Sequence, residues 1–164
     1  MATYTLISSV TVGSGGAANI DFTSIPATYT DLLVKSSLRE NSGNEYYLVS
    51  FNSSTSNFSS RYVEGDGNSV GSSTLARFAG RVNASTSTAS TFSNTDFYIP
   101  NYAGSNNKSY SVDSVNENNA TSAQKTLIAG LWADTSAITS ISFSLPAGNF
   151  VQYSTAYLYG ISNA

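Results

Sequence analysis

The chain has 164 residues, of which 7 are Lys or Arg and 10 are Asp or Glu, so its formal net charge is -3. This length suits a single domain, which we expect to span residues 1–164. Charged residues make up only 10% of the chain, and 64 of the 164 residues are Ser, Thr or Asn. The chain contains no Cys and no His, which excludes disulfides, thiol nucleophiles, Ser-His-Asp triads and the common zinc sites.

Other partners are disfavoured by what the chain lacks. No apolar run approaches the ~20 residues that a membrane helix needs, and the N-terminus shows neither region of a secretory signal. The seven cations are dispersed along a mildly acidic chain, which argues against nucleic-acid binding. We therefore expect no membrane, nucleic-acid or cofactor partner and no bound metal.

In the first half of the chain, hydrophobic residues recur with a period of two. Tyr4, Leu6, Val10 and Val12 share one parity, which predicts a half-buried strand over residues 3–12. Further strands are expected at 18–22, 31–39, 45–52 and 74–82. Between these strands, 13–16 and 41–44 are expected to be hairpin-like connections, 53–60 to hold one helical turn, and 83–93 to form a mobile loop or weak edge strand.

The second half of the chain continues the same pattern. Strands are expected at 95–100, 108–116, 125–133, 138–145 and 155–161, separated by polar turns. No window shows sustained helical periodicity, so the residues predict an all-β sandwich or barrel. The expected core residues are Leu6, Val10, Phe22, Leu32, Val34, Leu48, Phe51, Ile99, Val112, Leu127, Leu131, Ile141, Phe143 and Leu158.

Candidate chemistry is sparse. The ten carboxylates show no catalytic spacing, and the acidic segment 64–68 lacks the distant Glu that closes a calcium loop, so it is interpreted as a glycine-rich turn. Trp132 lies in an apolar segment and is expected in the core, whereas Tyr102 follows a proline in a loop and is expected to be exposed. Tyr102 is accordingly the candidate aromatic for an interface or a glycan contact.

Three segments carry a resemblance to a known class of protein. They are IDFTSIPATYTDL at 20–32, YIPNY at 98–102 with NNKS at 106–109, and GNFVQYS at 148–154 leading to LYGI at 158–161. Together they resemble small virion structural proteins of tailed bacteriophages, particularly phages of aquatic and cyanobacterial hosts. The resemblance extends over residues 3–161.

The resemblance implies an antiparallel jelly-roll sandwich of about eight strands that carries no catalytic residues. It implies a head decoration (cement) protein on the virion surface, made in the host cytoplasm, with the major capsid protein and further copies of itself, as a trimer, as partners. The alternative is a tail-fibre or receptor-binding module that recognises host glycans. The start at Met1 and the lack of a collagen-like or coiled-coil segment favour decoration, and self-contacts are expected at 3–12, 53–73 or 83–93.

Overall fold

The computed structural model describes residues 2–120 and 123–162, and within these ranges all regular secondary structure is β-strand. The all-β prediction is therefore confirmed. The strands are β1 (Thr3–Thr11), β2 (Asn19–Phe22), β3 (Asp31–Ser37), β4 (Tyr46–Phe51), β5 (Phe58–Gly65), β6 (Val70–Thr74), β7 (Phe78–Arg81), β8 (Asn94–Ile99), β9 (Lys108–Val115), β10 (Lys125–Trp132), β11 (Ile141–Ser144) and β12 (Thr155–Ser162).

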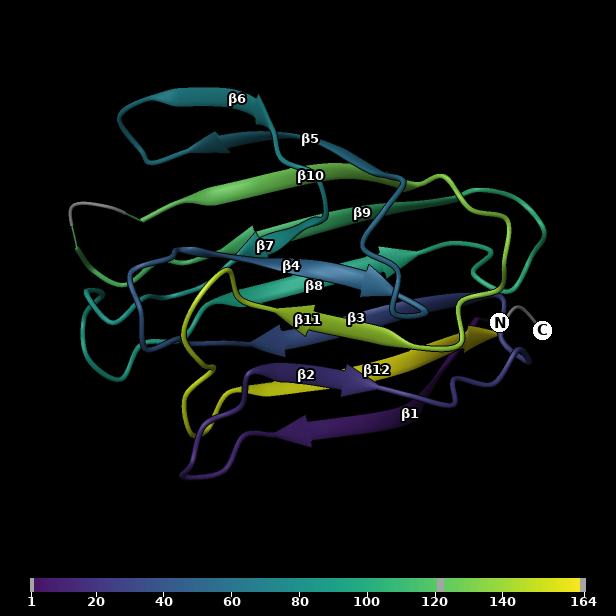
Figure 1. Ribbon diagram of the computed structural model, residues 1–164. Helices are drawn as coiled ribbons and strands as arrows, with labels where there is room; N and C mark the ends of the chain where they lie inside the picture. The colour runs from purple at the N-terminus through teal and green to yellow at the C-terminus, as the bar shows by residue number, and fades with distance from the viewer. Residues whose placement is uncertain (1, 121–122, 163–164) are drawn as a thin grey trace.

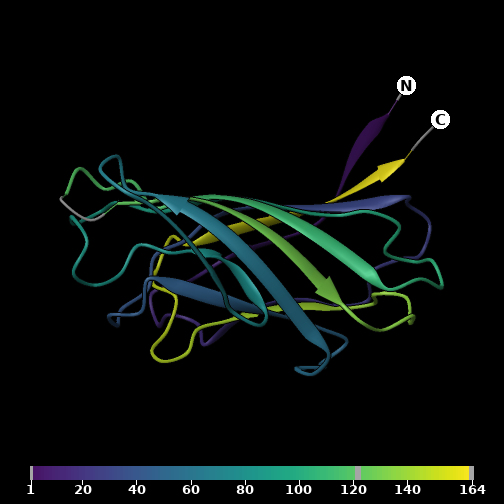
Figure 2. The same cartoon turned by 90° about the horizontal axis from the view of Figure 1, so that it is seen from above.

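The strands form two antiparallel sheets that pack face to face. The large sheet has eight strands in the order β1-β12-β3-β8-β9-β10-β5-β6, and the small sheet has four in the order β2-β11-β4-β7. Figures 1 and 2 show the small sheet as a separate layer against one face of the large sheet. The large sheet consequently keeps a second face with no sheet packed on it.

Several predicted connections differ from the structure. Residues 13–16 and 41–44 join strands of different sheets, so neither is a hairpin connection. The helical turn expected at 53–60 is absent from the described chain, because Phe58 already begins β5. The β5–β6 hairpin was not anticipated, since β6 contains no large hydrophobic residue except Val70 and all five of its residues are exposed.

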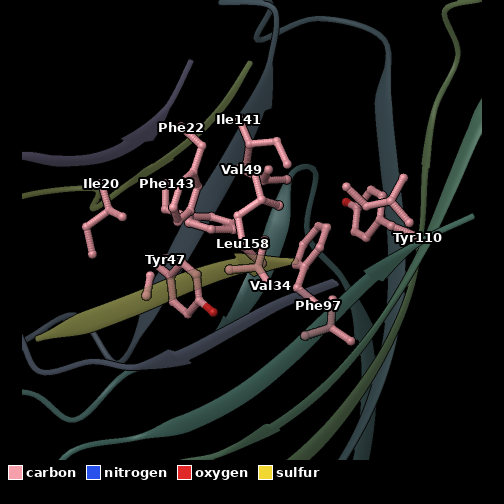
Figure 3. Packing of buried hydrophobic residues seen from close by; sticks show 14 of the residues in the cluster. Ile20, Phe22, Val34, Tyr47, Val49, Phe97, Tyr110, Ile141, Phe143 and Leu158 are labelled. Carbon is pink, nitrogen blue, oxygen red and sulfur yellow. The ribbon is translucent and has the colours of Figure 1, made fainter. Parts of the chain in front are cut away.

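Aromatic rings fill the space between the sheets. Phe51 of the small sheet lies 5.5 Å from Phe58, 6.4 Å from Phe97 and 5.6 Å from Trp132, measured between ring centroids. Figure 3 shows side chains from both sheets converging on this one cluster. The prediction that Trp132 lies in the core is confirmed, because only 1% of its surface is exposed.

Most of the expected core residues are buried. Nine are fully buried: Phe22, Leu32, Val34, Phe51, Ile99, Val112, Ile141, Phe143 and Leu158. Val10 and Leu48 are half-buried. The core prediction is wrong for Leu6, Leu127 and Leu131, which have 51%, 50% and 36% of their surface exposed.

The three wrong assignments have two structural causes. A β-bulge between Leu6 and Ser8 shifts the register of β1, so Leu6 points away from the core although Val10 points toward it. In β10 the buried positions are Thr126, Ile128 and Trp132, which directs the leucines of the other parity outward.

Candidate functional site

The most distinctive surface is the outer face of the large sheet, meaning the side chains that point away from the small sheet. Strand register identifies its members, because residues paired across neighbouring strands point to the same side. Successive cross-strand partners form rows that cross the large sheet from β1 to β6. One row consists of Leu6, Tyr159, Leu33, Tyr98, Ser111, Ala129, Arg61 and Thr74. The adjacent row contains Ser9, Tyr157, Lys35, Asp96, Asp113, Leu127, Val63 and Ser72.

The outer face is hollowed into a shallow groove with a volume of about 890 Å³. Its lining extends from Tyr4 on β1 to Ser72 and Thr74 on β6, so both edges of the large sheet border it. Leu33, Tyr98 and other central residues form its floor. The groove therefore spans the sheet rather than a single pair of strands.

Exposed apolar side chains concentrate on this face. Eight large hydrophobic residues are exposed in the described chain, and strand register puts seven of them on the outer face. These are Tyr4, Leu6, Val63, Val70, Leu127, Leu131 and Tyr157, and the eighth is Tyr153 in the loop before β12. A concentration of exposed apolar groups on one side marks an interaction surface.

Charged groups on the outer face are mostly paired. Lys35 Nζ lies 2.7 Å from Asp96 Oδ2, and Lys125 forms a second ion pair with Asp113. All four side chains are about half exposed, so each pair adds little to stability but leaves little free charge on the surface. Arg61 is exposed and forms no ion pair within the described residues.

The structure also brings together two carboxylates that the sequence reasoning did not connect. Asp96 and Asp113 are directly paired across β8 and β9. Only the tertiary fold reveals this, because nothing in the spacing of 17 residues marks them as neighbours. Each faces its own lysine, so the arrangement is a row of two ion pairs across the groove.

Tyr98 is held firmly in the floor of the groove. Its hydroxyl donates a hydrogen bond to Asp31 Oδ2 at 2.9 Å. Partial desolvation raises the pKa of Tyr98, and the hydrogen bond to Asp31 adds to this. Tyr98 therefore presents a neutral, fixed aromatic ring beside the ion-paired carboxylates.

The prediction for Tyr102 is wrong with respect to exposure. Tyr102 does lie in a turn, but only 1% of its surface is exposed. Its hydroxyl donates to the carbonyl of Pro26 and accepts a bond from the Tyr29 amide at 3.4 Å. The ring closes the space under the loop before β3, so it is not available to stack on a sugar or a partner.

The carboxylates of the acidic segment 64–68 form an ion pair and hydrogen bonds within the protein. Glu64 forms a partly buried ion pair with Arg81. Asp66 Oδ1 accepts hydrogen bonds from the amides of Asn68 and Ser69 at 2.8 and 2.6 Å. These bonds lower the pKa of Asp66 and close the turn between β5 and β6. Within residues 2–120 and 123–162, no three acidic side chains gather as metal ligands would.

The described residues contain no helix that could span a membrane. Comparison of the chain with protein-family models, curated proteins and solved structures finds no match. The geometry of the outer face is therefore the main guide to function.

Proposed function

We propose that the protein is a non-enzymatic virion structural protein that decorates a phage capsid through the outer face of its large sheet. The observation that carries this proposal is the concentration of seven of the eight exposed large hydrophobic residues on that face. On its solvent side the small sheet presents Asn19, Asp21, Ser142 and Ser144 together with the half-buried Leu48. None of the exposed large hydrophobic residues of the described chain lies on this sheet, so the two sides of the sandwich differ in character. Such a difference suits a protein that binds a surface on one side and faces water on the other.

The size of the face is adequate for a stable protein contact. Eight strands spaced about 4.8 Å apart give a width of roughly 34 Å, and their average of about seven residues gives a length of roughly 24 Å. The projected area of roughly 800 Å² compares with the ~800 Å² that each partner contributes to a standard protein interface. The major capsid protein is the partner that we propose, with further copies of this chain beside it on the virion.

The strand pairing also supports a jelly roll as the finer description of the fold. If the hairpins β5–β6 and β9–β10 are treated as insertions, the remaining strands pair as β1 with β12, β2 with β11, β3 with β8 and β4 with β7. A long antiparallel hairpin rolled into a sandwich produces this nesting of first with last. We propose that these eight strands are the jelly roll and that the two hairpins widen only the large sheet.

A receptor-binding role is the second candidate, and one observation favours it. The groove combines the exposed ring of Tyr4 and the fixed ring of Tyr98 with the polar groups of Asp96, Asp113 and Arg61. Rings and paired carboxylates are groups that bind sugars. Decoration remains the preferred function because the apolar residues extend over the whole sheet, beyond the groove.

Tyr4→Ser and Leu127→Ser variants test the docking face, with Tyr153→Ser as the matched control outside it. Undecorated heads, prepared from particles that lack this protein, serve as the binding probe. Each variant on the face should weaken binding about tenfold or more, since 1.4 kcal/mol corresponds to a factor of ten. The control should bind like the unchanged protein, because Tyr153 is equally exposed at 68% but lies in a loop.

Two results would contradict decoration. One is equal binding by all variants, and the other is a protein that ignores heads but binds host polysaccharide in a manner that depends on Tyr4. Copy number in purified particles separates the two functions further, because decoration requires hundreds of copies and a tail part roughly a dozen. Binding to heads should also change little with salt, since both lysines of the face are already paired and Arg61 is the one cation of the face without an ion pair in the described residues.

A further inference from the structure

Strand β1 forms one edge of the large sheet and has a single neighbour, β12. Its nine residues, TYTLISSVT, include no charge, no proline and no glycine. Edge strands of soluble proteins usually carry lysine, proline or a covering element that prevents pairing with another strand. The only such device in β1 is the bulge at Ile7, between Leu6 and Ser8, which leaves the segment Thr3–Leu6 regular.

The first part of β1 is accessible and apolar. Tyr4 and Leu6 are 63% and 51% exposed, and both point to the outer face. Figure 2 shows this end of β1 extending, together with the end of β12, beyond the rest of the large sheet. Another sheet edge could therefore approach without meeting the body of the molecule.

The segment is complementary to itself when it runs antiparallel about Thr5. A two-fold axis at Thr5 puts Tyr4 of one copy opposite Leu6 of the other, and Leu6 opposite Tyr4. Aromatic and aliphatic residues in such cross-strand pairs stabilise a sheet, as Thr opposite Thr also does. No charged group lies in the segment to oppose this pairing.

We propose that β1 pairs with β1 of a second copy of this chain, antiparallel and with the two-fold axis at Thr5. The axis is perpendicular to the sheet, so the outer faces of both copies lie on the same side and join into one continuous surface. This deepens the proposed self-association, and it favours an even copy number over the three copies expected from the resemblance. It does not require that the outer face binds a capsid.

The opposite edge of the large sheet is the main competitor for β1. Strand β6 is also uncharged and fully exposed, and it would meet β1 of another copy in the antiparallel sense. It is only five residues long, and its outward residues Val70, Ser72 and Thr74 offer no aromatic partner for Tyr4. The pairing of β1 with β1 therefore buries more apolar surface.

Cysteine cross-linking distinguishes these arrangements because the natural chain has no Cys. In the proposed pairing the two Thr5 side chains face each other about 5 Å apart at Cβ, within reach of a disulfide or a short bis-maleimide. Thr5→Cys should therefore give a covalent dimer under mild oxidation, at twice the 17.2 kDa of one chain. Ser72→Cys on β6 and Ser105→Cys in an exposed loop should stay monomeric on a denaturing gel.

Light scattering on the purified protein should show a dimer for the unchanged chain and for Thr5→Val. Thr5→Lys puts two like charges opposite each other and should give monomers with an unchanged β-sheet circular dichroism spectrum. Thr5 points away from the outer face, so loss of the dimer with retained binding of single copies to heads separates this proposal from the proposed docking. Ser73 of β6 points to the same side of the sheet as Thr5, so a β1–β6 contact would bring these two residues together. Cross-linking only when Thr5→Cys and Ser73→Cys are combined, or a monomeric unchanged protein at high concentration, would overturn the proposal.

Discussion

Two glycines of the large sheet are covered by aromatic rings. Gly130 of β10 is paired with Tyr110 of β9, and a Cβ added at Gly130 would lie 2.0 Å from the Tyr110 ring. A Cβ added at Gly160 of β12 would likewise lie 2.3 Å from the ring of Tyr29. The missing side chain lets the ring lie flat across the strand, which compensates for the weak packing of a strand glycine.

Gly130→Ala should therefore destabilise the protein by roughly 1–3 kcal/mol or more, because the Tyr110 ring has no free space into which to move. That ring is stacked on Phe97 at a centroid distance of 4.8 Å. Gly71→Ala is the matched control in a strand, since its nearest neighbouring atom would be 4.0 Å away. Urea unfolding measures both, and equal stability of the two variants would refute the packing argument.

Two buried tyrosines make the fold sensitive to alkali. Burial raises the pKa of Tyr47 and of Tyr110 from 10.0 to about 12. The unfolded chain therefore loses these protons first, so the stability that both hydroxyls provide is complete below pH 10 and is lost as pH rises toward 12. Burial lowers the pKa of Lys108, which acts with the opposite sign but only below its ordinary value of 10.5.

We expect the free energy of unfolding to fall between pH 10 and 12, by roughly 2–3 kcal/mol for each tyrosine. Denaturant titrations at pH 8 and pH 11.5 measure the loss. In Tyr110→Phe the loss of unfolding free energy between these two pH values should be smaller by roughly 2–3 kcal/mol, the share of one tyrosine. A Tyr110→Phe protein that loses as much stability as the unchanged protein would show that this hydroxyl does not control the alkaline transition.

At the scale of elements, one arginine binds the middle of segment 83–93, which the sequence predicts to be a mobile loop or a weak edge strand. Arg39 Nη1 donates to the carbonyls of Thr88 and Thr91 at 2.8 and 3.0 Å, and Nη2 donates to that of Ser87 at 3.0 Å. The fork of the guanidinium matches these three acceptors, and the single ammonium of lysine cannot. Backbone hydrogen bonds from Leu38 to Ser93 and from Glu40 to Asn83 attach the two ends of the loop to the segment that follows β3. The side chain of Arg39 attaches the middle of the loop, at residues 87–91.

Arg39→Lys should make residues 83–93 more accessible to proteases of broad specificity while the global unfolding midpoint changes little. The expected observation is earlier cleavage inside this segment, located by mass spectrometry. Arg61→Lys provides the control, since Arg61 lies exposed on β5. Unchanged cleavage in Arg39→Lys would mean that the backbone of the loop holds itself in place.

At the scale of the whole molecule, stability depends on contacts between the sheets. Phe51 of the small sheet contacts rings of β5, β8, β9 and β10 in the large one. Phe51→Ala should cost about 3–5 kcal/mol, the usual range for a buried Phe, and both sheets should unfold in one transition.

Leu127→Ala is the informative comparison, because the sequence places both residues in the core and the structure buries only Phe51. Leu127→Ala should lower the free energy of unfolding by no more than about 0.5 kcal/mol, as substitutions at other exposed positions do. Thermal unfolding followed by circular dichroism gives both values. Equal losses in the two variants would contradict the orientation of β10.

The sequence by itself determined the fold class and most strand positions. Alternating hydrophobic residues are a local signal, and they located β3, β4, β8, β9, β10 and β12 to within a few residues. It could not determine which parity faces inward where both parities are apolar, as at Leu127 and Ile128 of β10. The sequence also missed β5 and β6, because small and polar residues predominate in both strands and hydrophobic residues do not alternate clearly along them.

Only the tertiary structure decided what the surface offers. The bulge in β1 turned Tyr4 and Leu6 outward. Packing against the loop before β3 buried Tyr102, which the sequence had made the candidate aromatic because of its position in a loop. The pairing of β8 with β9 brought Asp96 beside Asp113. Each outcome depends on contacts between residues far apart in the chain, and a local pattern contains no information about which distant strand will be the neighbour.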